Sequence, residues 1–387
     1  DRLLETAERL GAYAGTIDPI AVARAWKMLI LNDEHSYGTS GYQGRRVFET
    51  WMQKRDWIER AAATASNELT KAVARLGLAP KDERRVEVLS GSTRENAFYR
   101  VTVNEKGEIA SLFDKALGRE LLLAQANRFL YTRDNHKSWC DESLLGATIT
   151  RRVFLSCDER RVDIEDRFEH AKDLFNANRY NRFGYLAFPF NVPNGAFKAR
   201  VAGGEMIRPY EDCHPFVSDA YVAVRDWCVV ENDDFGVALM MRDSMLTEFG
   251  EIHPDKTCYT GRPPNGSATI YPFLFTDWLQ MHQPDGDSMN FTFRFSITSY
   301  AAGERHRVEE VCADWLDPYA KWMRKQKVPT AKRVVCDTAA DGWTGLIEAP
   351  RAGHGEKDGQ LYLLWGAELA PSFSHYELWR DGAFRAV

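Results

Sequence analysis

Apolar residues recur with the period of an α-helix over the first 79 residues of the chain. A short helix near the N-terminus is predicted from the spacing of Leu3, Leu4, Ala7 and Leu10. A long helix is predicted over about residues 43–76, and the residues expected to point toward a core are Val47, Trp51, Ile58, Ala61, Leu69 and Val73. Gly77 follows in the position of a C-cap.

Another helix is predicted between these two. In "TIDPI", Asp18 stands in the N-cap position and Pro19 in the first helical position, where its missing N–H costs nothing. We expect one face of this helix to meet the core, formed by Ile20, Ala23, Trp26, Lys27 and Ile30. Three helices with short connections predict an antiparallel three-helix bundle over residues 1–80.

Strand-like alternation replaces the helical period from about residue 86 and continues to about residue 300. "RVEVLSG", "ITRRVFLSC" and "RVDIEDRFEH" alternate, and "NEKGE" signals a hairpin turn. Many short strands without intervening helices predict a large antiparallel, supersandwich-like β-sandwich. With the helical stretch "RVEEVCADWLDPYAKWM" at its end, this domain is expected to cover residues 81–329.

Residues 330–387 contain a Gly-rich loop, further strand patterns and a hairpin signal, "RDG". They predict part of a second, small β-sandwich of the fibronectin type. The predicted fold class is therefore α+β multidomain, with a three-helix bundle followed by two β-domains. Because the chain opens within a helical pattern, without an initiator Met or a signal peptide, we expect it to be a piece of a longer protein.

Composition excludes some classes of function. A formal net charge of -6 without a basic arm argues against nucleic-acid binding. The longest apolar runs are far shorter than the roughly 20 residues that span a bilayer. The seven cysteines form no CxxC pair, and an odd number cannot all be paired within the chain. Buried, reduced thiols are expected, which slightly favours a reducing compartment such as the cytoplasm and leaves the localisation unknown.

Candidate chemistry is concentrated between the second and third predicted helices, in "LNDEHSYGTSGYQG". Asp33, Glu34 and His35 are potential metal ligands, and Tyr37 follows them. Adjacent residues rarely all face one ion, so an alternative is that an acid caps the helix end, that His35 bonds locally and that Gly38 begins the turn. A complete zinc site needs three or four ligands, and this segment does not encode one alone.

"KMLILNDEHSYGTSGY" between two helices resembles the helical-domain segment of family 38 glycoside hydrolases, the α-mannosidases. The resemblance continues in "ENAFYRVTVNEKGEIASLFDKALGRELL", with its "GxIxSLxD" turn and "GREL" strand. "AYVAVRDWCVVENDDFGVALMMRDSMLTEFG" and "FTDWLQMHQPDGDSMNFTFRFSITSY" follow in the order of that family's β-domain. No single motif is specific, but their order and spacing together are.

The resemblance implies a retaining hydrolase whose zinc orients the mannose ring and is held by two aspartates and two histidines. His35 would be the one zinc ligand from this chain, with Asp33, Glu34 and Tyr37 as substrate contacts. The nucleophile, the acid and the other zinc ligands would lie on an N-terminal α/β domain preceding Asp1, so no catalytic residue is expected here. Known members carry His-His-Asp where this chain has Glu34, His35 and Ser36, which puts the substrate preference in doubt.

Three further sets of residues are candidates. His136 and the stretch Asn176 to Tyr185 are polar and aromatic enough to line a sugar site, although solvated loop is the favoured interpretation. "TDWLQMHQ" (Asp277, Trp278, Gln280 and His282) could face a cleft, and packing between domains explains it equally well. His214 and His253 are expected to be loop residues, and the Trp51 and Trp57 pair to be core or interface. Asp163 and Glu165 could form a carboxylate pair on one strand, but such a pattern recurs by chance.

Two classes of function remain open on the sequence. The first is a portion of a zinc-dependent α-mannosidase-like hydrolase with a carbohydrate substrate. The alternative is a non-catalytic carbohydrate-binding or interaction β-sandwich module, in which the helical bundle is only a spacer. The position of His35 separates them, because only a hydrolase needs this imidazole to face a cleft shared with a further domain.

Overall fold

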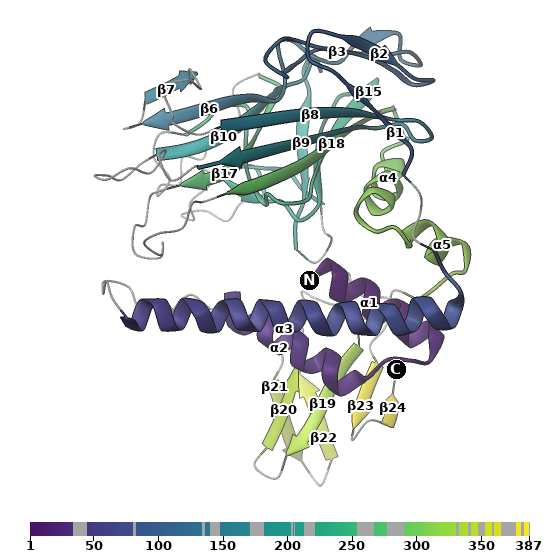
Figure 1. Ribbon diagram of the computed structural model, residues 1–387. Helices are drawn as coiled ribbons and strands as arrows, with labels where there is room; N and C mark the ends of the chain where they lie inside the picture. The colour runs from purple at the N-terminus through teal and green to yellow at the C-terminus, as the bar shows by residue number, and fades with distance from the viewer. Residues whose placement is uncertain are drawn as a thin grey trace. The chain divides into compact units, whose positions relative to one another are not determined.

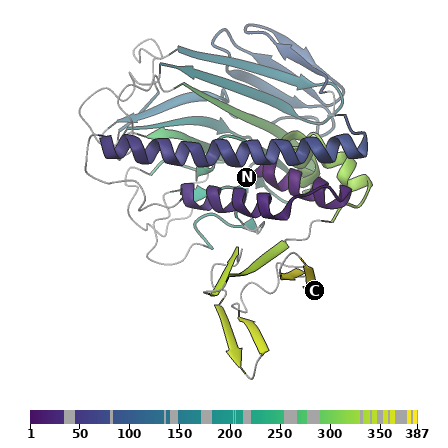
Figure 2. The same cartoon turned by 60° about the horizontal axis from the view of Figure 1, so that its bottom comes forward.

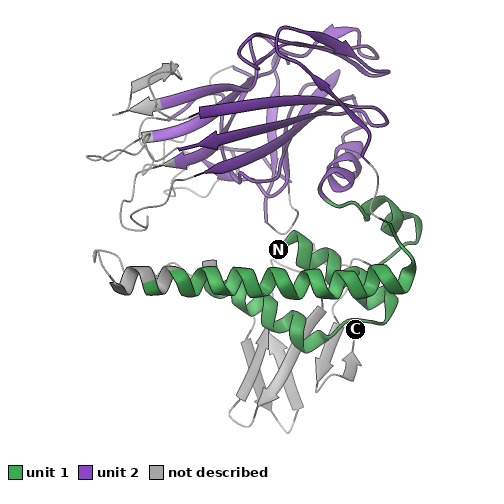
Figure 3. Ribbon diagram, in the orientation of Figure 1, with its two compact units in different colours: residues 1–81, 317–387 green, residues 82–316 purple. Residues whose placement is uncertain are grey.

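The computed structural model (Figure 1) describes residues 1–33, 45–79, 83–133, 136–139, 148–170, 182–202, 204, 206–212, 221–253, 267–276 and 290–329, together with the backbone of strands between residues 333 and 386. The chain divides into two units, which Figure 3 distinguishes by colour. One unit comprises residues 1–81 and 317–387, and the other comprises residues 82–316. None of the described helices is long and apolar enough to cross a membrane.

Three helices at the N-terminal end run beside one another (Figures 1 and 2): α1 (Arg2–Ala14), α2 (Pro19–Asp33) and α3 (Arg45–Leu76). The predicted cap of α2 is confirmed, because Asp18 Oδ1 accepts the backbone N–H of Ile20 at 3.0 Å and of Ala21 at 3.1 Å. One apolar cluster joins all three helices through Leu4, Ala7, Val22, Ala25, Ala61 and Ala65. The small residues of this cluster allow the helix backbones to approach closely.

The prediction of which face of α2 meets the core is wrong. Ile20 and Ile30 are 63% and 55% exposed, and the buried positions are Val22 and Ala25. Trp26, Met28 and Leu29 pack against the same cluster. Arg24 and Lys27 are exposed on the same side of the helix as Ile20, so the charged residues mark the solvent face that was predicted to meet the core. On α3, Ala61 is buried as expected, whereas Ile58 is 44% exposed.

The predicted C-terminal helical stretch consists of two helices, α4 (His306–Leu316) and α5 (Ala320–Lys325), with Asp317, Pro318 and Tyr319 between them. The sequence placed both with the strands, but α5 packs on the helical unit. Met323 of α5 shares an apolar cluster with Leu10 of α1 and Ala72 of α3. Thr6 Oγ1 also donates to Asp317 Oδ2 at 2.7 Å, which fixes the start of this segment to α1.

The described residues of the other unit form three antiparallel sheets. The eight-stranded sheet runs in the order β1 (Arg85–Val88), β8 (Thr148–Ser156), β9 (Val162–Glu169), β18 (Phe291–Ala301), β15 (Phe235–Met241), β14 (Trp227–Glu231), β11 (Ala196–Arg200) and β12 (Met206–Ile207). The six-stranded sheet runs in the order β13 (Val222–Ala223), β16 (Leu246–Phe249), β17 (Thr269–Thr276), β10 (Arg182–Pro189), β6 (Arg128–Arg133) and β7 (His136–Trp139). The four-stranded sheet contains β2 (Thr93–Glu95), β3 (Tyr99–Val103), β4 (Ile109–Asp114) and β5 (Arg119–Glu120).

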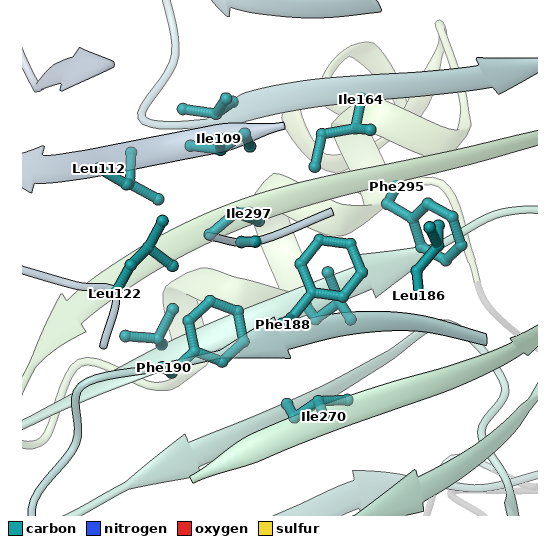
Figure 4. Packing of buried hydrophobic residues seen from close by; sticks show 14 of the residues in the cluster. Ile109, Leu112, Leu122, Ile164, Leu186, Phe188, Phe190, Ile270, Phe295 and Ile297 are labelled. Atoms are coloured by element: carbon teal, nitrogen blue, oxygen red, sulfur yellow. The ribbon is translucent and has the colours of Figure 1, made fainter. Parts of the chain in front are cut away.

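These three sheets share one hydrophobic core. Figure 4 shows side chains of the large sheets gathered in one apolar layer, among them Phe295 and Ile297 of β18, Phe188 of β10 and Ile270 of β17. Ile109 of the four-stranded sheet joins the same layer. The expectation of a mostly antiparallel, β-rich region is confirmed.

A separate cluster lies on the outer face of the eight-stranded sheet, where α4 packs. Trp227, Val229, Ala238 and Tyr300 contribute from the strands, and α4 contributes Val308, Cys312 and Trp315. Three described cysteines are free thiols, of which Cys228 and Cys312 are buried, as expected, whereas Cys157 is exposed.

The remaining strands follow α5. A four-stranded sheet has the order β20 (Gly342–Leu346), β19 (Arg333–Ala339), β23 (Glu377–Arg380) and β24 (Ala383–Ala386). β21 (Gly353–Lys357) pairs with β22 (Gln360–Leu364). The "RDG" turn signal is confirmed, because β23 and β24 are antiparallel neighbours, while β19 and β23 pair in parallel.

Candidate functional site

The segment with the predicted metal and substrate residues connects α2 to α3. Helix α2 ends at Asp33 and α3 begins at Arg45. Glu34, His35, Tyr37 and the side chain of Asp33 lie outside the described residues. The structure therefore fixes the two helices on either side of the segment and leaves the assignment of His35 as a prediction.

The helices that carry this connection are held at defined positions along each other. Glu68 of α3 is buried and accepts the backbone N–H of Asp18, at the start of α2, at 3.1 Å. Its other carboxylate oxygen accepts from Lys71 Nζ at 2.5 Å. Halfway along α2, Trp26 Nε1 donates to Glu8 of α1 at 3.0 Å. These polar contacts fix the helices in register, so the end of α2 at Asp33 is attached to an ordered frame.

The donor types of this connection fit a zinc ion, because imidazole and carboxylate are both ordinary zinc ligands. Among the residues that the structure describes, no group of three or more His, Cys, Asp or Glu side chains converges as a metal site. A zinc ion bound through His35 would need further ligands from outside the described residues. Neighbouring acids such as Asp33 could orient the imidazole or contact substrate.

The carboxylate pair considered on β9 has structural partners. Asp163 is buried and accepts from Arg161 Nε at 3.0 Å and from Ser296 Oγ at 2.7 Å. Burial raises the pKa of Asp163, although the Arg161 guanidinium opposes this effect. Glu165 lies directly across from Arg152 on β8 and from Arg294 on β18. Because these groups are engaged within the sheet, they do not form an open pair for acid and base chemistry.

A buried carboxylate on the six-stranded sheet was missed by the sequence interpretation. Glu248 of β16 is fully buried, and its Oε1 accepts from the Tyr185 hydroxyl at 2.6 Å. Its Oε2 accepts the backbone N–H of His253 at 2.7 Å. Burial, with the Glu248 carboxylate beside it, raises the pKa of Tyr185 well above its usual value. Tyr185 is therefore a neutral hydrogen-bond donor that holds a carboxylate in place.

The available signal for this cluster was a single acid in the short strand "LTEF", between Thr247 and Phe249. Tyr185 belongs to the polar-aromatic stretch that the sequence singled out, and His253 lies in the loop after β16, as expected, but is buried.

Trp57 is half-buried on α3. The other candidates lie outside the described residues: residues 176–181, His214, Asp277, Trp278, Gln280, His282 and the side chains of Trp51 and His136.

Comparisons with known proteins identify the fold. No protein-family model and no curated protein sequence matches the chain. Among solved structures, it is similar to an alpha-mannosidase from Enterococcus faecalis V583, with a TM-score of 0.54 and 12% identity over 83% of this chain and 55% of that one. A protein in glycosyl hydrolase family 38 from Enterococcus faecalis gives a TM-score of 0.53 and 12% identity, over 83% of this chain and 57% of that one.

The resemblance noticed in the sequence thus has a counterpart in three dimensions, since the chain folds like part of these family 38 structures. It spans a little over half the length of either one. An identity of 12% establishes similarity of fold alone.

Proposed function

We propose that this chain is a portion of a zinc-dependent, retaining glycoside hydrolase that acts on α-mannosides or related glycans. The observation that supports this most is the fold similarity to the alpha-mannosidase from Enterococcus faecalis over 83% of the chain. The position of the histidine motif agrees with it, because the motif connects two packed helices, as the resemblance to family 38 implies.

His35 is proposed to be a zinc ligand. When bound, zinc would orient a sugar ring and polarise its hydroxyl groups. Asp33, Glu34 and Tyr37 are proposed to accept or donate hydrogen bonds to that ring, or to hold the imidazole in its ligating orientation. Ser36, which replaces the aspartate of better-known members, would weaken a contact with the sugar hydroxyls and shift the substrate preference.

The bond-breaking groups are proposed to come from another part of the whole protein. Retention requires a carboxylate nucleophile and a carboxylic acid about 5–5.5 Å apart. The described carboxylates Asp163 and Glu248 are buried in structural contacts and cannot take these roles. The chain alone is therefore expected to be inactive.

The test is made on the full-length protein that contains this chain. His35→Ala should lose bound zinc and lower kcat/KM on an aryl α-mannoside by at least ~100-fold. Mutating a residue that only hydrogen-bonds to a zinc ligand typically lowers metal affinity or activity about 10–100-fold, and loss of the ligand itself should cost more. The matched control is His170→Asn, because His170 is exposed on the β-rich unit and has a positive φ of 57° that asparagine also adopts. This control should keep both zinc and activity.

The proposal would be rejected if the folded His35→Ala protein kept its zinc and its activity. It would also be rejected if the wild-type protein hydrolysed no α-linked glycoside while binding zinc in full. Circular dichroism of each variant shows whether the helices remain folded, so that an unfolded protein is not mistaken for an inactive one.

A further inference from the structure

We propose that the β-rich unit carries a binding pocket for a neutral saccharide, between the outer face of its eight-stranded sheet and the first turn of α4. The pocket uses none of the residues Asp33 to Tyr37. It has a volume of about 620 Å³, within the range of roughly 300–1,000 Å³ of small-molecule sites. Strands β11, β12, β14, β15 and β18 form one side, and His306 and Glu309 of α4 form the other.

The floor of the pocket is shaped by a glycine. Gly236 of β15 lies directly across from Tyr300 of β18, and a Cβ at Gly236 would stand 2.3 Å from the Tyr300 hydroxyl oxygen. The absence of a side chain lets the Tyr300 ring lie flat over β15 and reach β14. There its hydroxyl donates to Glu231 Oε2 at 2.6 Å. The ring thus lines the pocket without filling it.

Glu231 holds one polar wall in place. Its Oε1 accepts from Lys198 Nζ at 2.7 Å and from Arg305 at 2.6 Å. Arg305 uses one terminal nitrogen in this contact, and its guanidinium presents further N–H groups along a partly exposed side chain. Asp233, exposed at the turn after β14, adds a carboxylate to the same rim. Fixed donors and acceptors side by side can bind neighbouring hydroxyl groups of a sugar.

Arg200 and Trp227 line another part of the pocket. Arg200 pairs with Asp226 at 2.8 Å and with Glu309 of α4 at 3.3 Å. Trp227 also lines the pocket, and no described residue makes a hydrogen bond with its buried indole Nε1–H. A buried donor without a partner costs about 1–3 kcal/mol, so a small side-chain movement that let a ligand hydroxyl accept from it would favour binding.

Charge determines which class of ligand fits. The lining contains two arginines, Arg200 and Arg305, against three acids, Glu231, Asp233 and Glu309. With the imidazole of His306 neutral, the formal charge is -1, and the acids neutralise the arginines through ion pairs. A phosphate or carboxylate ligand would therefore gain no net attraction. A polyhydroxylated neutral ligand fits these paired charges, because its hydroxyl groups can donate to the acids and accept from the arginines.

The experiment observes the tryptophan indole signals of the 387-residue chain by NMR, during titration with methyl α-D-mannoside and with maltose. Eleven tryptophans give eleven indole signals, and the signal absent from Trp227→Phe identifies Trp227. We expect that signal to shift saturably with at least one neutral sugar. Glucuronate at the same concentration, as the anionic comparison, should leave it unmoved.

Two variants introduce a phenylalanine at exposed positions of the same unit, one at the pocket and one away from it. Ala302→Phe fills the rim of the pocket without removing an ion pair, and should weaken sugar binding at least tenfold. Met245→Phe, at a residue that is 64% exposed and does not line the pocket, should leave binding unchanged.

The proposal would be overturned by an unmoved Trp227 signal at 100 mM of both neutral sugars, by unchanged binding in Ala302→Phe, or by a preference for glucuronate. His35→Ala separates this proposal from the proposed hydrolase function. That substitution should abolish zinc binding in the full-length protein and leave the Trp227 titration of the chain as it was.

Discussion

At the scale of single residues, the motif "GxIxSLxD", which resembles family 38, consists of residues whose contacts stabilise the fold. Gly107 has a φ of 78° in the turn that "NEKGE" predicted, and Ile109 is buried in the core. Ser111 Oγ donates to Glu120 Oε2 at 2.6 Å, which links the motif to the "GREL" strand. Asp114 is fully buried, and its Oδ1 accepts the backbone N–H groups of the following turn.

Asp114 is expected to be one of the residues on which stability depends most. Its Oδ2 accepts from Arg160 and from the Ser299 hydroxyl, which itself lies 2.7 Å from the Tyr99 hydroxyl. Asp114→Ala would remove the counter-charge of the partly buried Arg160, which keeps only its bond to the Ser299 carbonyl, and the acceptor of two backbone N–H groups. We predict a loss of about 3–5 kcal/mol in the free energy of unfolding, measured by urea denaturation.

The control for this prediction is another Asp–Arg pair in the same unit. Asp158 pairs with Arg84, but both side chains are well exposed, at 45% and 67%. Asp158→Ala should therefore cost no more than about 1 kcal/mol. Equal losses in the two variants would show that burial does not determine the strength of these contacts.

Single residues also show which features could be predicted from the sequence. Asp18 and Pro19 marked the start of α2 correctly, because a cap is a local interaction between neighbouring residues. The burial of Glu248 could not be foreseen, because its partner Tyr185 lies 63 positions away in the chain. The site residues Glu34, His35 and Tyr37 remain predictions, since they lie outside the described part of the chain.

At the scale of elements, Glu231 links four parts of the β-rich unit. It belongs to β14 and binds Lys198 of β11, Tyr300 of β18 and Arg305, the residue before α4. Burial opposes its ionisation, but the hydrogen bonds from Lys198 and Tyr300 and the charge of Arg305 outweigh this effect and lower the pKa of Glu231. The carboxylate therefore attaches the start of α4 to the sheet.

This arrangement predicts a pH dependence with a definite sign. A carboxyl whose pKa is lower in the folded than in the unfolded chain stabilises the fold above its unfolded pKa of about 4.3. That stabilisation is lost as the pH falls through the lower, folded pKa. The difference in unfolding free energy between wild type and Glu231→Gln should thus shrink between pH 6 and pH 3. A difference that stayed constant or grew over this range would contradict the assigned role.

Elements were predicted better than their packing. Strand alternation and turn signals gave the antiparallel character of residues 86–300, since each strand carries its own pattern. The packing of α5 on α1 and α3 could not be predicted, because it depends on contacts between opposite ends of the chain. The predicted buried face of α2 was wrong for a different reason: it included Lys27, which is exposed together with Arg24 on the side of Ile20.

At the scale of the whole molecule, the chain corresponds to a little over half of the length of the family 38 structures that it resembles in fold. The proposed hydrolase would use it as a helical frame that presents one histidine, together with a β-rich unit that carries its own ligand pocket. A purely carbohydrate-binding protein would need the pocket and not the histidine. The two hypotheses therefore differ in what His35 contacts.

The most direct test is crystallography of the full-length protein, with an anomalous difference map at the zinc absorption edge. Our account predicts a peak about 2.0–2.1 Å from a ring nitrogen of His35, with its other ligands supplied by residues outside this chain. A fully occupied zinc ion elsewhere in the protein, with the His35 imidazole packed against α2 or α3, would contradict it.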